Sequence, residues 1–483
     1  MTARIVIAGT SSGAGKTTVA SGLMAAFRAR GRTVQGAKVG PDFIDPSYHA
    51  LATGRPARNL DAFLAGPELV APLLAHGIAD HADDGRPADL TVIEGVMGLF
   101  DGASGRGELA STAHVAKLTR SPVVLVVDAA AMARSVAALV LGFRNYDLAV
   151  DVAGVILNRV GSSFHADLLR EALEPIGVPV LGALTRDDRL VAPSRHLGLV
   201  PVEERDARAR ETLDVLAARV AAEVDLDALE RLAGAAPALG PAWDPTQALA
   251  RAAGEPGRTP ATGPGATPAA AGGLVAVPPP PDRRPRIAYA AGAAFTFRYT
   301  ENLELLRAAG AELVPVDPLR DAELPEATDA LYLGGGFPEE HGEALAANAP
   351  LRAAVAGLAA AGRPIVAECG GLLYLGGTLD GRPMCGVLEG TGALGTRLTL
   401  GYREAEAGAD SPLWRAGEVV RGHEFHYSTL TPEATSPPAW TLRSRGRERP
   451  EGVATGTLHA SYLHTHWAAF PQAAARLVAA ASA

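Results

Sequence analysis

Short apolar runs, each followed by a polar or glycine-rich turn, recur through both halves of the chain. Runs that are apolar at nearly every position are typical of parallel strands buried on both faces. Helical spacing follows the first run, at positions 19, 23, 24 and 27. The pattern predicts an α/β fold with two doubly wound domains. The expected strands are 5–8, 33–39, 90–93, 123–128, 152–157, 178–184, 286–290, 312–316 and 330–333.

The segment 234–285 breaks this pattern. Ala, Gly and Pro dominate it, and Pro278–Pro281 is a run of prolines. This composition favours a flexible or semi-rigid connector over a packed element. We therefore expect a domain at 1–232, a linker at 233–285 and a second domain at 286–483.

The first apolar run leads into a loop of Gly, Ser and Thr that ends in Lys-Thr-Thr before the helix. Glycines let backbone N–H groups turn toward phosphate oxygens, and the helix N-terminus adds its dipole. Lys16 is expected at the β- and γ-phosphates, and the Thr17 hydroxyl at Mg²⁺. The alternative is a strand-to-helix turn that binds nothing. The residues expected to bind ATP are Gly13, Gly15, Lys16, Thr17 and Thr18.

The spacing of this loop departs from the strict phosphate-loop motif. Thr10 stands where the motif has its first glycine, and Gly9 lies one residue earlier. This longer loop resembles that of dethiobiotin synthetase and its relatives, which activate carboxylates with ATP. The same class often reads adenine with an Asn after a later strand, and Asn158 is the candidate here.

Acidic residues follow two of the expected strands. Asp42 and Asp45 lie in a loop between Pro41 and Pro46, and Glu94 and Asp101 follow the strand at 90–93. The carboxyl ends of parallel strands are where α/β sheets bind ligands. We expect Asp45 and Glu94, with Thr17, to hold Mg²⁺, and Asp42, Asp45 and Asp101 to contact substrate. Ordinary turn chemistry is the alternative for the first two acids.

In the second half, an expected strand runs into Cys369, with small residues at Ala367 and Gly371. This is the layout of a nucleophile elbow, in which a sharp turn exposes the side chain at a helix start. The helix N-terminus is expected to lower the pKa of the thiol. A buried structural cysteine is the alternative. Three glycines, Gly334–Gly336, follow another strand and are able to present N–H groups to an oxyanion.

A cysteine nucleophile needs a base, and His464 and His466 offer one. Five of the twelve histidines lie between 423 and 466, so a metal site is the rival interpretation. However, His423-Glu-Phe-His426 is one residue short of the His-Glu-x-x-His zinc motif, and no clear carboxylate or thiolate set completes a site.

Composition limits the partners. The formal net charge is −9, which does not indicate a nucleic-acid partner. No apolar run is long enough to span a bilayer, and no secretory signal is recognised at the N-terminus. The two cysteines make no disulfide framework. A cytoplasmic enzyme fits these features.

The ordered set of motifs resembles the family of cobyrinic and hydrogenobyrinic acid a,c-diamide synthases of cobalamin biosynthesis. The resemblance covers nearly the whole chain except the linker. It rests on motifs at 9–18, 38–46, 94–102, 367–371, 422–428 and 461–466.

The resemblance implies a dethiobiotin synthetase-like phosphate-loop NTPase domain that activates carboxylates, followed by a class I glutamine amidotransferase-like domain. Cys369 would attack glutamine, His464 would be its base, and N–H groups of Gly335 or Gly336 and of Gly370 would form the oxyanion hole. The class usually has Glu two residues after the His, whereas this chain has His466, which leaves open what orients His464. The implied substrates are ATP, L-glutamine and a corrinoid polycarboxylate, with Mg²⁺ as cofactor. Ammonia transfer between the two sites implies that the domains dock, and a homodimer is left open.

Three other functions remain as alternatives. Cobyric acid synthase and the nickel-sirohydrochlorin a,c-diamide synthase share the two domains. A partitioning-type ATPase with an inactive glutaminase-like binding module is a non-enzymatic alternative, against which intact Cys369 and His464 count.

Overall fold

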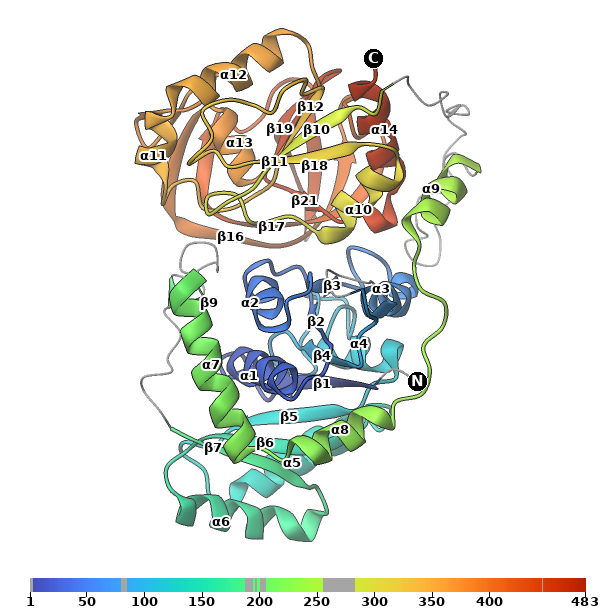
Figure 1. Ribbon diagram of the computed structural model, residues 1–483, viewed down its shortest axis with the longest axis vertical. Coiled ribbons are helices and arrows are strands. Elements are labelled where there is room, and N and C mark those ends of the chain that lie inside the picture. The colour runs from blue at the N-terminus through green and yellow to red at the C-terminus, as the bar shows by residue number, and fades with distance from the viewer. Residues whose placement is uncertain are drawn as a thin grey trace. The chain divides into compact units, whose positions relative to one another are not determined.

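The computed structural model describes residues 3–79, 85–186, 194–195, 198–199, 206–254, 283–444 and 446–483. The chain divides into two compact units, Met1–Trp243 and Asp244–Ala483 (Figure 1).

The N-terminal unit is built on a seven-stranded parallel sheet with the order β3-β2-β4-β1-β5-β6-β7. Its central strands are buried along almost their whole length, as their apolar sequences indicate. The strands are β1 (Ala3–Gly9), β2 (Val34–Val39), β3 (Arg58–Leu60), β4 (Leu90–Glu94), β5 (Val123–Asp128), β6 (Val152–Val160) and β7 (Val180–Thr185).

Helices connect these strands and cover the sheet. One core joins β1 to α1 and α7 through side chains such as Ile5, Leu23, Phe27 and Val220. The helices are α1 (Lys16–Ala29), α2 (Ile44–Thr53), α3 (Pro67–Ala79), α4 (Thr112–Thr119), α5 (Ser135–Tyr146), α6 (Ser163–Leu173), α7 (Asp206–Glu223) and α8 (Leu226–Gly234). A 3₁₀ turn, η1 (Glu174–Ile176), follows α6, and β8 (Ser194–Arg195) pairs with β9 (Gly198–Leu199).

The C-terminal unit has a mixed twelve-stranded sheet. Its parallel part has the order β11-β10-β12-β13-β20. These strands are β10 (Arg286–Ala290), β11 (Glu312–Val316), β12 (Ala330–Leu333), β13 (Ile365–Glu368) and β20 (Leu458–Ser461). The helices are α9 (Pro245–Gly254), α10 (Thr300–Ala308), α11 (Gly342–Ala347), α12 (Ala349–Ala360), α13 (Gly370–Leu375) and α14 (Gln472–Ala481), with a 3₁₀ turn η4 (Trp467–Ala469).

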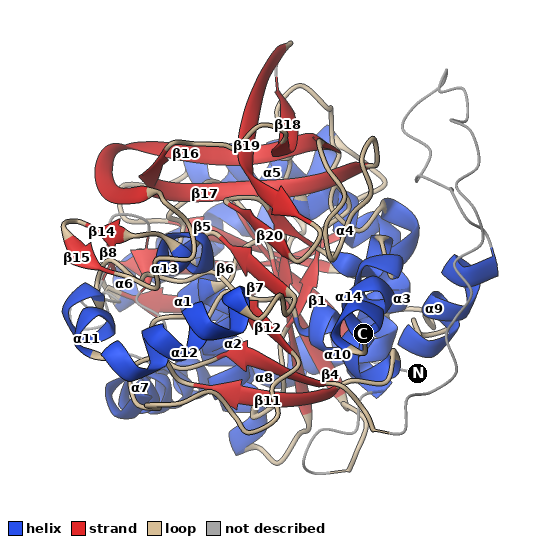
Figure 2. Ribbon diagram, turned by 90° about the horizontal axis from the view of Figure 1, so that it is seen from above, coloured by secondary structure: helices blue, strands red, loops and turns tan. Residues whose placement is uncertain are grey.

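Beyond β20 the sheet continues mostly with antiparallel strands, of which β16 and β17 form a long ribbon (Figure 2). The sequence predicts only one part of this extension, a strand and loop at 421–428; the other strands were not predicted. The strands are β14 (Thr378–Leu379), β15 (Arg382–Pro383), β16 (Thr391–Ala407), β17 (Val419–Thr431), β18 (Pro438–Ser444), β19 (Arg447–Thr455) and β21 (His464–Thr465).

The expected linker contains more structure than its composition indicates. Trp243 is buried in the N-terminal unit, where its backbone N–H donates to the Pro72 carbonyl at 2.9 Å. Helix α9 then packs against α10 and α14. The expectation that no packed element lies at 233–285 is therefore wrong for this part, because its alanines support a helix. Residues 255–282 lie outside the described part of the chain.

Within the described ranges, every helix is too short or too polar to cross a lipid bilayer.

Candidate active sites

The phosphate loop connects β1 to α1, as its sequence indicates. Gly13 and Gly15 adopt φ values of +78° and +97°, a region that side chains other than glycine rarely enter. Lys16 folds back over the loop, and its Nζ donates to the Ser11 carbonyl at 3.1 Å. A Cβ on Gly9 would lie 3.0 Å from the Lys16 chain, so glycine gives the lysine room. Thr18 lies in the first turn of α1.

Asn158, at the carboxyl end of β6, lies directly against this loop. Its Nδ2 donates to the Ala14 carbonyl at 3.0 Å, and a Cβ on Gly15 would lie 2.1 Å from the same nitrogen. In this structure Asn158 stabilises the phosphate loop through this hydrogen bond. The expectation that Asn158 binds the adenine base stays a prediction.

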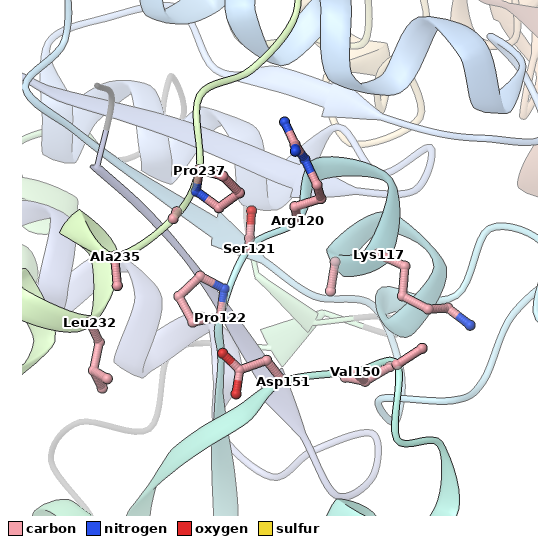
Figure 3. A pocket seen from close by; sticks show the side chains of 12 residues that line it. Lys117, Arg120, Ser121, Pro122, Val150, Asp151, Leu232, Ala235 and Pro237 are labelled. Carbon is pink, nitrogen blue, oxygen red and sulfur yellow. The ribbon is translucent and has the colours of Figure 1, made fainter.

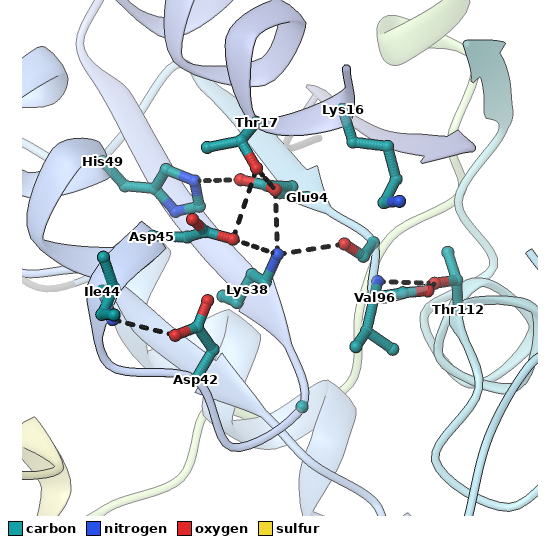
Figure 4. Close-up of polar contacts among 12 residues, drawn as sticks. Lys16, Thr17, Lys38, Asp42, Ile44, Asp45, His49, Glu94, Val96 and Thr112 are labelled. Carbon is teal, nitrogen blue, oxygen red and sulfur yellow. Dashed lines mark hydrogen bonds and ion pairs between the residues drawn. The ribbon is translucent and has the colours of Figure 1, made fainter. Parts of the chain in front are cut away.

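A cluster of charged side chains lies beside Thr17 (Figure 4). Lys38 Nζ, from β2, donates to Asp45 Oδ2 at 2.6 Å and to Glu94 Oε1 at 2.8 Å. The Thr17 hydroxyl donates to Glu94 Oε1 at 2.6 Å and lies 3.4 Å from Asp45 Oδ2. His49 Nε2, from α2, lies 2.6 Å from Glu94 Oε2. The structure thus brings the three expected metal ligands together, around an ammonium group.

Burial and charge together set the protonation of this cluster. Burial favours neutral Glu94, but Lys38 and His49 outweigh it and hold the pKa of Glu94 well below its ordinary value. Burial also acts to lower the pKa of Lys38, but Asp45 and Glu94 raise it overall. Burial and the charges of Asp42 and Glu94 raise the pKa of Asp45 well above its ordinary value. Lys38 therefore balances the charge of Glu94, whereas burial and the neighbouring carboxylates favour the neutral form of Asp45.

Asp42 and Asp101 shape the neighbouring loops. Asp42 Oδ1 accepts the Ile44 N–H at 2.9 Å at the start of α2. Asp101 Oδ2 accepts the Gly98 N–H at 3.0 Å, and its charge acts on Lys16. Asp42 thus serves the turn chemistry that was its alternative role, and Asp101 serves its own loop in the same way; contact of either residue with substrate stays a prediction.

The donor set fits Mg²⁺. The hydroxyl of Thr17 and the carboxylates of Asp45 and Glu94 are hard oxygen donors, and both carboxylates lie within 3.4 Å of the hydroxyl. Magnesium in nucleotide sites is usually held by one or two carboxylates plus phosphates and waters. In the described ranges, no three His, Cys, Asp or Glu side chains are grouped as a self-sufficient metal site, which applies equally to the histidines at 423–466.

In the C-terminal unit, Cys369 forms a sharp turn between β13 and α13. Its φ of +50° is strained for a residue with a side chain, as expected of a nucleophile elbow. The Cys369 N–H donates to the Ser461 carbonyl at 2.7 Å, which ties the elbow to β20. Its Sγ lies 3.9 Å from the Phe425 carbonyl oxygen.

His464, on β21, faces the same small space as Cys369. A Cβ on Gly335 would lie 2.5 Å from His464 Cε1 and 3.3 Å from Cys369 Cβ. A Cβ on Gly336 would lie 2.1 Å from the Ala294 carbonyl oxygen, and one on Gly370 would lie 3.0 Å from Gly336 N. A side chain at any of the three glycines expected at the oxyanion hole would therefore clash with its neighbours, and at Gly335 these neighbours are His464 and Cys369.

The expectation of a lowered thiol pKa is wrong. Burial, aided by the charge of Glu339, raises the pKa of Cys369, and the N–H of Gly370 only partly opposes this. The thiol is 4% exposed, so desolvation outweighs the helix N-terminus. Cys369 therefore needs a base to become a nucleophile.

Sequence analysis missed three residues at these sites, namely Lys38, His49 and Glu368. Glu368 ends β13 and lies 3.7 Å, Oε2 to Nδ1, from His464. The sequence carried a signal for two of the three, because Lys38 and Glu368 are charged residues at or next to the carboxyl end of a buried strand. His49 carried none, since a single histidine on a helix is common.

A hollow of about 450 Å³ lies elsewhere on the N-terminal unit (Figure 3). Its lining includes Arg120, Pro122 and Asp151, which precede β5 and β6. It therefore lies at the amino ends of these parallel strands, whereas the phosphate loop follows the carboxyl end of β1.

Comparison with known proteins agrees with this arrangement. Residues 5–200 match the model of the CobQ/CobB/MinD/ParA nucleotide binding domain, and residues 286–472 match that of the CobB/CobQ-like glutamine amidotransferase domain.

Three curated relatives are similar along nearly their whole length. A hydrogenobyrinate a,c-diamide synthase of Streptomyces coelicolor is 56% identical over 98% of this chain and 96% of its own. One of Thermobifida fusca is 51% identical over 99% and 97%. A cobyrinate a,c-diamide synthase of Synechococcus is 41% identical over 97% and 96%.

Proposed function

The chain belongs to the family of hydrogenobyrinate and cobyrinate a,c-diamide synthases, glutamine-dependent ligases that form C–N bonds, and from this premise we propose how its two sites share the reaction. The N-terminal unit activates a corrin carboxylate with ATP. The C-terminal unit releases ammonia from glutamine. The observation that carries this proposal is that one chain contains both sites. In each site the charged or nucleophilic groups lie close to one another.

In the N-terminal unit the carboxylate is converted to an acyl phosphate. A free carboxylate is a poor acceptor for ammonia, because oxide is a poor leaving group, whereas phosphate is a good one. Lys16 and the loop N–H groups bind the phosphates, and Thr17, Asp45 and Glu94 would hold Mg²⁺. Mg²⁺ neutralises phosphate charge when bound. Lys38 adds a second cation beside the carboxylates.

In the C-terminal unit His464 takes the proton of Cys369, whose buried thiol is otherwise protonated. The sulfur attacks the glutamine amide carbon, and N–H groups of Gly335 or Gly336 and of Gly370 stabilise the oxyanion. The proton passes from His464 to the leaving ammonia, and water hydrolyses the thioester to glutamate.

Hydrogenobyrinic acid, the ring without cobalt, is the preferred substrate under this proposal. Five relatives named for it are 49–56% identical to this chain, and three relatives named for cobyrinate are 41–44% identical. The amides form on the a- and c-acetate side chains.

The variant Cys369→Ser tests whether glutamine hydrolysis and carboxylate activation take place at separate sites. Glutamine-supported amidation should be lost, while ammonium chloride should still support amidation, because the ATP site is unchanged. Cys385→Ser, at the other buried cysteine, is the matched control and should keep glutamine-supported activity. Retention of glutamine-supported amidation in Cys369→Ser would contradict the proposal.

A further inference from the structure

The base His464 lacks the carboxylate that its class usually places two residues later. His466 stands there, and it is fully buried. Its Nε2 lies 3.5 Å from Glu301 Oε2, and its ring packs on Tyr299 with centroids 4.7 Å apart. His466 is therefore engaged with residues at the start of α10.

A different carboxylate lies beside His464. Glu368, the residue before the nucleophile, is 3% exposed, and its Oε2 is 3.7 Å from His464 Nδ1. The pairing of the strands explains why Glu368 and His464 lie close together. β13 pairs with β20, which leads through a short turn into β21, so Glu368 and His464 meet across the sheet rather than along the chain.

The Glu368 carboxylate is held in place by donors on both of its oxygens. Oε1 accepts the Thr465 N–H at 3.3 Å and the Thr465 hydroxyl at 3.1 Å. Oε2 accepts the Tyr332 hydroxyl at 3.2 Å. Burial and the charge of Glu368 raise the pKa of Tyr332 well above its ordinary value, so this phenol remains a donor. Because Thr465 adjoins His464, the same carboxylate also anchors the strand that carries the base.

We propose that Glu368 positions His464 for glutamine hydrolysis. Glu368, which directly precedes the nucleophile Cys369, takes the role of the carboxylate that the class usually has at the position of His466. The proposal rests on the proposed glutaminase function. Glu368 is a positioning residue, since it acts through His464 and touches neither Cys369 Sγ nor the substrate amide in this role.

The chemistry requires one tautomer of His464. With Nδ1–H directed at Glu368, Nε2 carries the lone pair that accepts the Cys369 proton. The resulting imidazolium is stabilised by the Glu368 carboxylate until the proton passes to ammonia. A separation of 3.7 Å is longer than a hydrogen bond, and such contacts commonly shorten when substrate binds.

The histidine that pairs with the base in the sheet adds no positive charge beside it. His423, from β17, is paired in register with His464. Burial and the neighbouring His464 lower the pKa of His423 to about 3, so His423 is neutral at physiological pH.

The variant Glu368→Gln tests this role, because an amide keeps the shape but is able to donate to Nδ1 and favour the wrong tautomer. We expect the kcat of glutamine hydrolysis to fall by about 10³-fold, with KM for glutamine nearly unchanged. Glu301→Gln, which alters the carboxylate beside His466, is the matched control and should retain glutaminase activity. A Glu368→Gln chain with at least half of the normal kcat would overturn the proposal.

A double variant separates positioning from general damage. If Glu368 acts through His464, adding Glu368→Gln to His464→Ala should cause no further loss. Losses that multiply would overturn the proposal. Ammonia-supported amidation, which needs neither residue, reports that each variant is folded. An unaltered chain that hydrolyses no glutamine with ATP and corrin acid present would contradict the proposed function itself, and with it any role for Glu368.

Discussion

At the scale of single residues, the N-terminal site depends on one buried ammonium group. Lys38 contacts both Asp45 and Glu94, and the Lys38 and Glu94 side chains are at most 5% exposed. Removing one partner of a buried ion pair leaves an uncompensated charge, which costs about 3–5 kcal/mol. The stability of the unliganded unit is therefore coupled to a residue of the proposed active site.

We expect Lys38→Met to lower the melting temperature of the protein in the absence of divalent cations. Added Mg²⁺ should restore part of the loss, because it supplies charge to the same carboxylates. Lys117→Met is the matched control. Lys117 also pairs with two carboxylates, Glu108 and Asp147, but all three are partly exposed, so its loss should cost about 1 kcal/mol or less. Equal melting shifts for the two variants, measured by differential scanning calorimetry, would contradict this account.

Glu451 gives the C-terminal unit a pH-dependent stability. Burial and the charge of Glu424 raise the pKa of Glu451 to about 7, whereas an unfolded Glu titrates near about 4.3. Between these values the folded state holds a proton that the unfolded state releases. The stabilisation of the folded state by protonated Glu451 is therefore fully present below the lower pKa and is lost as the pH rises through the upper pKa.

The stability of the wild type should thus fall relative to Glu451→Gln between about pH 4.5 and pH 7, by at most about 3 kcal/mol. Urea unfolding at several pH values measures the difference. The exposed Glu448→Gln is the control and should show no such trend. A stability difference between wild type and Glu451→Gln that does not change with pH would rule this out.

At the scale of elements, the phosphate loop is fixed by its glycines and by Asn158. Gly15 needs both a positive φ and empty space, because Asn158 Nδ2 would lie 2.1 Å from a Cβ. Gly13 also has a positive φ but has nothing within 4 Å of such a Cβ. Position 15 is therefore the more restrictive of the two.

We expect Gly15→Ala to weaken ATP binding far more than Gly13→Ala, which meets only the backbone strain of about 1–2 kcal/mol. Isothermal titration calorimetry with ATP and Mg²⁺ compares the two Kd values. Similar Kd values for both variants would show that the contact with Asn158 does not shape the loop.

Sequence reasoning succeeded where one stretch of chain determines the structure. The phosphate loop and the Cys369 elbow are each strand, glycine turn and helix in immediate succession, and the parallel strands are continuous apolar runs. It failed where distant segments meet. Lys38 joins Asp45, Glu94 and His49 only because β2 pairs with β4 and α2 packs nearby, and Glu368 meets His464 through β20 and β21. The thiol expectation failed because burial, which the sequence does not display, outweighs the helix dipole.

At the scale of the whole molecule, two chemical half-reactions are assigned to different units. We expect Glu94→Gln to abolish amidation with either glutamine or ammonia, because it alters the carboxylate shared by Thr17, Lys38 and His49. Cys369→Ala should abolish only the glutamine-supported reaction. Assaying both variants with both nitrogen sources checks this, and ammonia-supported amidation by Glu94→Gln at the normal rate would contradict the assignment of the N-terminal site.

The most direct test of the central claim is mass spectrometry of the product. The chain is supplied with ATP, Mg²⁺ and glutamine, and each reaction contains one acceptor: hydrogenobyrinic acid, cobyrinic acid, sirohydrochlorin or hydrogenobyrinic acid a,c-diamide. The account predicts two amides on the corrin ring, at the a- and c-acetate positions, with hydrogenobyrinic acid converted faster than cobyrinic acid. Four amides made only from a diamide starting material, or no amide on any ring while ATP is hydrolysed, would contradict it.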